Sequence, residues 1–267
     1  MITKTQLPSK YKDIIDTQVE KFKTKIFTDE VAKIPNVDDI PGEQSTKWLK
    51  IPDVICVFVD MKNSTKFSAR HHAGTTARVY TLFTGTAVRL FKAFGASYID
   101  IKGDGVFALF NSDQVHAALC AAVTFRTFVT NEFSTKVTNK TEVETGVHIG
   151  IDQATLIVSK IGLKKSATRG DMHNEVWAGK AVNMAAKLSS LSDNDEICVS
   201  DRFYKNITSL KALNSCTCGG EPQLLWKEYD LTEDERFSFR TAHILESSWC
   251  KEHGAEYLDE ILLSDAE

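Results

Sequence analysis

Two aspartates stand at the ends of hydrophobic segments. Asp60 closes "VICVFVD", an apolar run of strand length, and Asp104 occupies the turn of "YIDIKGDGVFALF", which predicts a β-hairpin. If these strands are neighbours in one sheet, about 4.8 Å apart, their ends bring both carboxylates to the same cations. Carboxylates without thiols favour Mg²⁺ or Mn²⁺, which bind substrate phosphates as well. The pair predicts a site for two such ions, which could activate an attacking oxygen and neutralise a leaving pyrophosphate.

The segment after Asp60, "MKNST", suits phosphate binding. Small polar residues that follow a strand let successive backbone N–H groups point at an anion. A helix N-cap by Asn63, Ser64 or Thr65 accounts for the same residues and is compatible with this hypothesis. The predicted phosphate contacts are Lys62, Asn63, Ser64 and Thr65.

A third motif lies in "VWAGKAVNMAAKLSS", whose composition predicts a helix. Asn183 and Lys187 are four residues apart, so they project from one face of that helix. The amide could hold a ribose oxygen, and the ammonium group could offset charge that develops on a phosphate. A locally bonded Asn and a solvated Lys are the structural alternative.

The elements that must position these groups alternate between strand and helix. Helices are predicted over 72–94, 114–132, the Asn183 segment and 201–207. Strands are predicted over 54–60, 98–110 as a hairpin, 142–151, 154–162, 196–200, and near 224–231 and 239–245. Asp152-Gln153 is predicted to form a turn between two of these strands. The pattern indicates an α/β (α+β) sandwich, with a mixed sheet and helices on one or both faces.

The chain is predicted to have three parts. Residues 1–48 are polar and Lys-rich, and Pro35 and Pro41 interrupt a weak helical pattern, which predicts a helical arm and a linker. Residues 49–210 hold the motifs described above and form the main domain. Residues 211–267 complete the sheet and end in an acidic tail.

Composition limits the function classes. The net charge of −4 argues weakly against a nucleic-acid partner, and no stretch approaches the roughly 20 apolar residues of a membrane span, so a cytoplasmic protein is expected. Several of the six cysteines lie in hydrophobic runs, where reduced thiols act as core residues. Cys216-Thr-Cys218 could be half of a metal site, but no second pair is evident to complete it.

In this order, the motifs resemble those of the class III nucleotidyl cyclases, over about residues 52 to 205. "VFVDMKNST" resembles the first metal strand of that family, "IKGDGVFALF" its metal hairpin, "GVHIGI" its central strand and "GKAVNMAAKL" its Asn helix. The resemblance implies a mainly antiparallel sheet and a head-to-tail homodimer with composite sites. It implies metal binding by Asp60, Asp104 and the carbonyl of Met61, with Asn183 on the ribose of the nucleotide bound by the partner.

Three positions depart from the family pattern. Lys187 stands where the family has Arg, so the charge is kept but the bidentate fork is lost. Asp100 and Val176 stand where purine-specific members have Lys and Asp, and a shift of one residue would bring Glu175 or Trp177 to the second position.

These departures are similar to those of the Pycsar cyclases, bacterial antiphage enzymes that make cyclic pyrimidine nucleotides. The resemblance implies conversion of UTP to cyclic UMP as a second messenger read by an unknown effector. A cytidylate cyclase, an adenylate or guanylate cyclase with an unusual base pocket, and a degenerate nucleotide-binding module remain alternatives.

Other charged residues are weaker candidates. The resemblance places Lys164, with Lys165, near a phosphate-contacting Arg of the family and Lys227 near a late Lys, although a solvated lysine is the alternative for each. His148 and His173 could act in proton transfer, but the strand pattern around His148 predicts a core residue.

Overall fold

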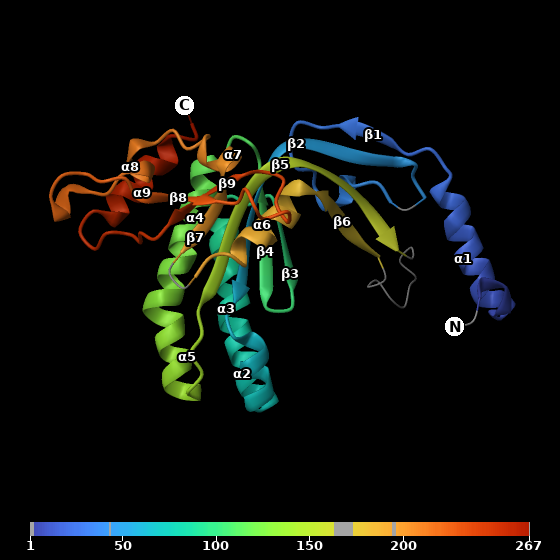
Figure 1. Ribbon diagram of the computed structural model, residues 1–267, viewed down its shortest axis with the longest axis horizontal. Helices are drawn as coiled ribbons and strands as arrows, with labels where there is room; N and C mark the ends of the chain where they lie inside the picture. Colours follow the sequence, from blue (N-terminus) through green and yellow to red (C-terminus); the bar gives the residue numbers. More distant parts are fainter. Residues whose placement is uncertain (1–2, 43, 163–172, 194–195, 267) are drawn as a thin grey trace.

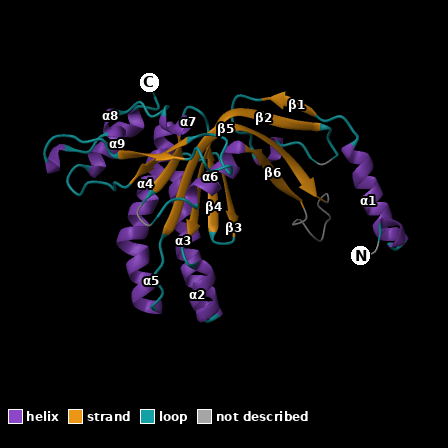
Figure 2. Ribbon diagram, viewed as in Figure 1, coloured by secondary structure: helices purple, strands orange, loops and turns teal. Residues whose placement is uncertain are grey.

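The computed structural model describes residues 3–42, 44–162, 173–193 and 196–266. Within these residues the chain forms a mixed, mainly antiparallel sheet of nine strands with helices against both faces (Figures 1 and 2), which confirms the predicted fold class. The central strand order is β3-β4-β2-β5-β7-β9-β8, while β1 pairs with β2 and β6 pairs with β5. Among the strand pairs of the described residues, β1–β2 and β5–β7 are parallel and the others are antiparallel.

The strands are β1 (Phe27–Glu30), β2 (Lys47–Met61), β3 (Tyr98–Lys102), β4 (Gly105–Phe110), β5 (Val147–Gly162), β6 (His173–Gly179), β7 (Ile197–Ser200), β8 (Trp226–Asp230) and β9 (Thr241–Leu245). The α-helices are α1 (Ser9–Phe22), α2 (Ser64–Arg70), α3 (Ala73–Ala93), α4 (Val115–Phe128), α5 (Ser134–Thr141), α6 (Lys180–Ser189), α7 (Asp201–Tyr204), α8 (Leu210–Leu213) and α9 (Gly254–Leu263). A π-helical turn, Val129–Phe133, joins α4 to α5.

The apolar run of β2 is buried on both faces of the sheet, as its composition predicts. Ile55, Val57 and Val59 belong to the core beneath α3 and α4. Val54 and Cys56 face the opposite side, where they join the core that includes α6. This alternation places Asp60 on the α6 face, at the end of a strand fixed by two cores.

Gly150 sets how closely α6 approaches β5. A Cβ atom on this residue would lie 2.0 Å from the carbonyl oxygen of Ala185 and 2.4 Å from the backbone nitrogen of Ser189. Both are backbone atoms of α6, so a side chain at this position must displace the helix. Gly150 therefore determines where Asn183 and Lys187 are held relative to the sheet.

Gly150→Ala is expected to lower the free energy of unfolding by about 3 kcal/mol, because the overpacked helix has to move away from β5. Denaturation in urea measures this loss. Gly74→Ala is the matched control: it lies in the first turn of α3, with nothing within 4 Å of the place that a Cβ would occupy, and should leave stability unchanged or slightly higher. Equal effects of the two substitutions would contradict the role assigned to Gly150.

The turn predicted at Asp152-Gln153 is wrong, because β5 runs unbroken from Val147 to Gly162. The Asp152 side chain is fully buried, and its carboxylate is paired with the guanidinium of Arg202, whose Nε donates to Oδ1 at 2.7 Å. A bidentate Arg offsets much of the cost of burying the carboxylate. The partner lies 50 residues further on, which is why a local pattern of polar residues suggested a turn.

The segment between α1 and β2 is more than a linker, since it contains β1 and buries Ile34 and Ile40. The pattern did not reveal β1 because all four of its residues are exposed. The division of the chain into three parts stays a prediction.

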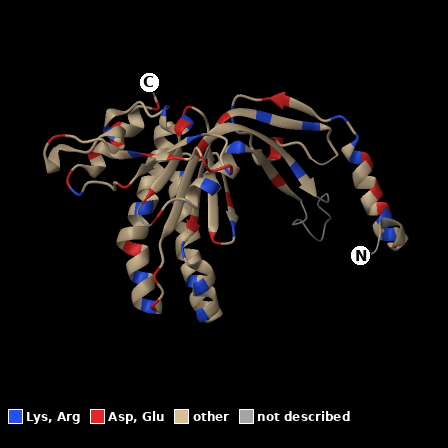
Figure 3. Ribbon diagram, viewed as in Figure 1, with Lys and Arg blue, Asp and Glu red and all other residues tan. Residues whose placement is uncertain are grey.

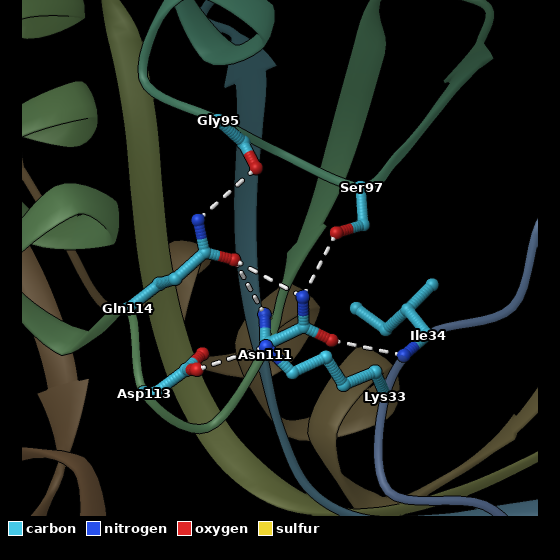
Figure 4. A network of polar contacts seen from close by, with 7 residues as sticks. All are labelled: Lys33, Ile34, Gly95, Ser97, Asn111, Asp113 and Gln114. Atoms are coloured by element: carbon cyan, nitrogen blue, oxygen red, sulfur yellow. Dashed lines mark hydrogen bonds and ion pairs between the residues drawn. The ribbon is translucent and has the colours of Figure 1, made fainter.

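The side chain of Asn111, at the end of β4, forms hydrogen bonds that hold this N-terminal segment against the sheet (Figure 4). Its Oδ1 accepts a hydrogen bond from the backbone N–H of Ile34 at 2.9 Å, and its Nδ2 donates to the hydroxyl of Ser97 at 3.1 Å. Gln114 supports the same turn, because its Oε1 accepts from the backbone N–H of Asn111 and its Nε2 donates to the carbonyl of Gly95. One side chain thus joins three segments.

Asn111→Ala is expected to cost about 1–3 kcal/mol of unfolding free energy, because the Ile34 amide and the Ser97 hydroxyl lose their partner. The midpoint of urea unfolding reports the change. Asn139→Ala, at an exposed position of α5, should change stability by less than about 0.5 kcal/mol. If Asn139→Ala lowered the free energy of unfolding as much as Asn111→Ala, the hydrogen bonds of Asn111 would not account for the loss of stability.

Candidate active site

Asp60 and Asp104 come together where β2 meets the β3–β4 hairpin. Asp60 is opposite Gly105 in the ladder, and its Oδ1 lies 3.2 Å from the place that a Cβ on Gly105 would occupy. Gly103 makes the turn at φ +68°, a conformation that favours glycine. The absence of side chains on both sides of Asp104 leaves room for a ligand at the two carboxylates.

The electrostatics of this pair suit a divalent cation. Partial burial raises the pKa of Asp60 from 3.8 to about 6, and the negative charge of Asp104 contributes to the increase. Two carboxylates that repel each other, one of them partly buried, gain from a shared cation, and their oxygen atoms are the ligands that Mg²⁺ and Mn²⁺ prefer. The described residues therefore fit the metal site predicted from the sequence.

His148 is a third group at this site. It is opposite Asp60 in the β2–β5 ladder, so both side chains lie on the same face, and its charge acts to lower the pKa of Asp60. Its Nδ1 donates to the carbonyl of Ser192 at 2.7 Å, which fixes the ring. The strand pattern indicated only a core residue. If the end of "VFVD" had been paired with the start of "VHIG" as antiparallel strands, the sequence would have predicted that His148 lies beside Asp60.

The phosphate-binding candidates follow in the turn from β2 into α2. Asn63 has φ +62°, and its Nδ2 donates to the carbonyl of Glu144 at 3.0 Å instead of its side chain capping the helix. Among the described contacts no side chain caps the first turn of α2. Its leading N–H groups are thus available to an anion. The Met61 side chain is buried in the core, so this residue offers the site only its backbone.

Asn183 and Lys187 lie on the side of α6 away from the sheet, while Ala181, Ala185 and Leu188 are buried. The Asn183 side chain is exposed, and Nζ of Lys187 donates to the carbonyl of Arg236 at 2.7 Å. In the described part of the chain, neither side chain forms a hydrogen bond or ion pair with Asp60 or Asp104. The geometry of one chain is thus compatible with a site completed by a second.

The two positions predicted to line a base pocket differ in their surroundings. Asp100 on β3 forms an ion pair with Lys102 at 2.7 Å, on the same face as Tyr98. Val176 on β6 is 39% exposed. Because side chains alternate along a strand, Val176 faces away from its neighbours Glu175 and Trp177.

Glu175 and Trp177 are the β6 residues that approach β3. The rings of Trp177 and Tyr98 have centroids 4.8 Å apart, and the Tyr98 hydroxyl lies 3.4 Å from Oε2 of Glu175. Burial, and next the charge of Asp100, raise the pKa of Tyr98 well above its ordinary value. The structure thus forms an aromatic and acidic cluster of Tyr98, Asp100, Glu175 and Trp177 on the face that carries Asp60.

The remaining lysine candidates are Lys164, Lys165 and Lys227. Lys164 and Lys165 lie outside the described residues. Lys227 is exposed on β8, where its Nζ is 2.5 Å from Oε1 of Glu246, and three strands separate β8 from β2. The phosphate-binding role of Lys227 stays a prediction.

None of the described helices has the length and apolar character needed to span a membrane. Basic and acidic residues are interspersed along the elements in view (Figure 3).

Comparison with known proteins identifies the class. Residues 48–224 match the family described as "Adenylate and Guanylate cyclase catalytic domain". The chain belongs to this family of nucleotidyl cyclases, which confirms the resemblance found in its motifs and its assignment as an enzyme.

The chain is also similar to individual nucleotidyl cyclases. The chain is 35% identical over 237 residues to a uridylate cyclase of Propioniciclava tarda, an alignment that covers 85% of this chain and 74% of the relative. It is 33% identical to a uridylate cyclase of Micromonospora echinofusca, over 82% of this chain and 72% of the relative. The guanylate cyclase domain of RhGC from Catenaria anguillulae, solved in complex with GTP, has a TM-score of 0.59 and 15% identity, and the match covers 74% of this chain and 98% of that domain.

Proposed function

We propose that this protein is a uridylate cyclase, which converts UTP to 3′,5′-cyclic UMP and pyrophosphate in a homodimer with two composite sites. The observation that carries the proposal is the convergence of Asp60 and Asp104 on the sheet face that also presents the cluster of Tyr98, Asp100, Glu175 and Trp177. The names of the two bacterial relatives favour UTP over other nucleotides.

The residues of the proposed site have different roles in the reaction. Asp60 and Asp104 would hold two Mn²⁺ or Mg²⁺ ions, which when bound lower the pKa of the ribose 3′-hydroxyl and neutralise charge on the phosphates. The backbone of residues 61–65 positions the triphosphate. Asn183 of the other subunit orients the ribose. The ammonium group of Lys187, from the same helix, would leave the carbonyl oxygen of Arg236 and offset the negative charge of the phosphates.

The reaction itself is an intramolecular displacement. The 3′-oxygen attacks the α-phosphorus, the bond from the α-phosphorus to the bridging oxygen breaks, pyrophosphate leaves, and the hydroxyl proton is released. Catalysis here consists of positioning and electrostatic stabilisation. No protein general base is assigned, since the geometry gives His148 a fixed contact with Ser192 rather than a free path to the substrate.

The cluster between β3 and β6 supports a pyrimidine. In the proposed site, the rings of Tyr98 and Trp177 would leave room for a single-ring base, and Asp100 and Lys102, which pair with each other, would offer an acceptor and a donor to its edge. Carboxylates at Asp100 and Glu175 replace the Lys-and-Asp pair of purine-specific members. Cytosine has a size similar to uracil, so CTP is the second candidate.

The direct test incubates the purified protein with each of UTP, CTP, ATP and GTP in the presence of Mn²⁺, and identifies the cyclic product by mass spectrometry. The proposal expects cyclic UMP as the main product, with an equal amount of pyrophosphate. Cyclic CMP, AMP or GMP as the main product would replace UTP by another substrate, and no product from any nucleotide would favour a degenerate binding module. A role in antiphage defence stays a prediction.

A further inference from the structure

A cluster of three cysteines and one histidine lies outside the catalytic groups. Cys216 and Cys218 come from the loop between α8 and β8, whereas Cys250 and His253 come from the segment between β9 and α9. Their four ligand atoms all lie within 4.8 Å of one another. In the sequence, Cys216-Thr-Cys218 could be half of a metal site, but no second pair completed it. The fold supplies the other half as Cys250-Lys-Glu-His253.

The geometry and chemistry of this cluster match zinc. Three thiolates and one imidazole form one of the common structural zinc sites, in which zinc–sulfur bonds of about 2.3 Å place two sulfur atoms about 3.7 Å apart. The Sγ atoms of Cys218 and Cys250 are 3.6 Å apart, close to this separation. Nδ1 of His253 lies 2.9 Å from the Sγ of Cys218, which is closer than the separation of about 3.5 Å between a nitrogen and a sulfur ligand of one zinc ion. The sulfur atoms are too far apart for a disulfide, whose bond is about 2.05 Å long.

The surroundings of Cys250 resemble those of a sulfur ligand. The backbone N–H groups of His253 and Glu252 donate to its sulfur. N–H donors to a sulfur ligand are typical of metal sites. By contrast, Cys56, Cys120 and Cys198 are buried in the core, where they act as small apolar residues.

We propose that Cys216, Cys218, Cys250 and His253 bind one structural zinc ion that joins the α8–β8 loop to the start of α9. All four positions of a tetrahedral ion would be filled by protein, which leaves no place for substrate and distinguishes this site from a catalytic one. Helices α8 and α9 lie side by side at one end of the molecule, away from the β3–β4 hairpin (Figure 1).

The site supplies a cross-link where the chain has little regular structure. Few residues of the loop between α8 and β8, or of the segment between β9 and α9, lie in helices or strands. Helix α9 is also held by an ion pair of Lys211 with Glu260 and by the Asp265 carboxylate, which accepts hydrogen bonds from the first turn of α4. Zinc would thus fix one end of α9 while Asp265 fixes the other.

Metal content tests the proposal on the full-length protein, purified without added zinc or chelator. Wild type should hold about one zinc ion per chain, and Cys218→Ser and Cys250→Ser should hold none. Cys198→Ala, which removes a cysteine on β7, and Asp60→Asn, which removes a catalytic carboxylate, should keep their zinc. Zinc at wild-type levels in both serine variants, or its absence from wild type, would overturn the proposal.

A second measurement uses wild type alone, in case the serine variants do not fold. After removal of zinc with a chelator, the thermal midpoint should fall, and Zn²⁺ should restore it while Mn²⁺ and Mg²⁺ should not. Added Co²⁺ should give the visible bands and the sulfur-to-cobalt charge-transfer band of a tetrahedral thiolate site. Restoration by Mn²⁺ alone, or a cobalt spectrum without the charge-transfer band, would contradict zinc binding at these cysteines. Neither readout depends on cyclase activity.

Discussion

Asp60→Asn is expected to lower turnover of UTP more than about 100-fold, because the substitution removes one of the two carboxylates proposed to hold the ions. Asp104→Asn should have the same effect. The chain should stay folded in both variants, since neither side chain is part of the apolar core. Cyclic UMP formation at saturating Mn²⁺ and UTP measures the loss.

The same substitution should make the metal-free protein more stable at neutral pH. The pKa of Asp60 is raised to about 6 in the folded chain, so ionisation disfavours folding: the full stability is present below about pH 4 and falls as the pH rises from there through 6. Asn carries no charge and should recover on the order of 1–2 kcal/mol at pH 7, a figure reduced for solvent screening. The gain should disappear below pH 4.

Asp29→Asn serves as the matched control, because it removes an exposed carboxylate of β1 that pairs with Lys47. Turnover should be close to wild type in this variant, and stability should change by less than about 1 kcal/mol. Activity retained in Asp60→Asn, or a stability gain that is independent of pH, would contradict the assignment of Asp60.

Mixing two inactive variants is expected to restore activity. In the proposed dimer each site takes its aspartates from one chain and Asn183 from the other. A heterodimer of Asp60→Asn and Asn183→Ala therefore contains one fully mutated site and one intact site. With random exchange of subunits, half of the dimers are mixed, so the sample should reach about a quarter of wild-type activity.

The control for this experiment combines Asp60→Asn with Asp104→Asn. These residues belong to the same half of a site, so every site of the mixed dimer carries one of the two substitutions and no activity should return. Restoration by this pair, or none by Asp60→Asn with Asn183→Ala under conditions of proven exchange, would show that the sites are not shared as proposed.

Local patterns predicted the elements that carry the catalytic motifs. The run that ends at Asp60, the hairpin around Asp104 and the helix with Asn183 are found where the sequence indicates them, because burial and turn chemistry act over a few residues. The convergence of the two aspartates also followed, since adjacent strands bring their ends together.

Features that depend on distant partners were not predictable in this way. The polar pair at Asp152-Gln153 suggested a turn because the ion pair with Arg202 is formed only in the fold. Cys250 and His253 complete the cluster of Cys216 and Cys218 across 32 to 37 residues, and His148 reaches Asp60 through strand pairing. For the predicted base pocket, position in the family motif indicated Val176, whereas strand alternation places Glu175 and Trp177 on the face that contacts Tyr98. The residues that contact a base stay a prediction.

The most direct test of the active-site account is a crystal structure with Mn²⁺ and a non-hydrolysable UTP analogue. Anomalous density is expected for two ions between the carboxylates of Asp60 and Asp104 of one chain, with the ribose beside Asn183 of the second. Ions bound at separate places by these aspartates, or a ribose that contacts α6 of the same chain, would contradict it.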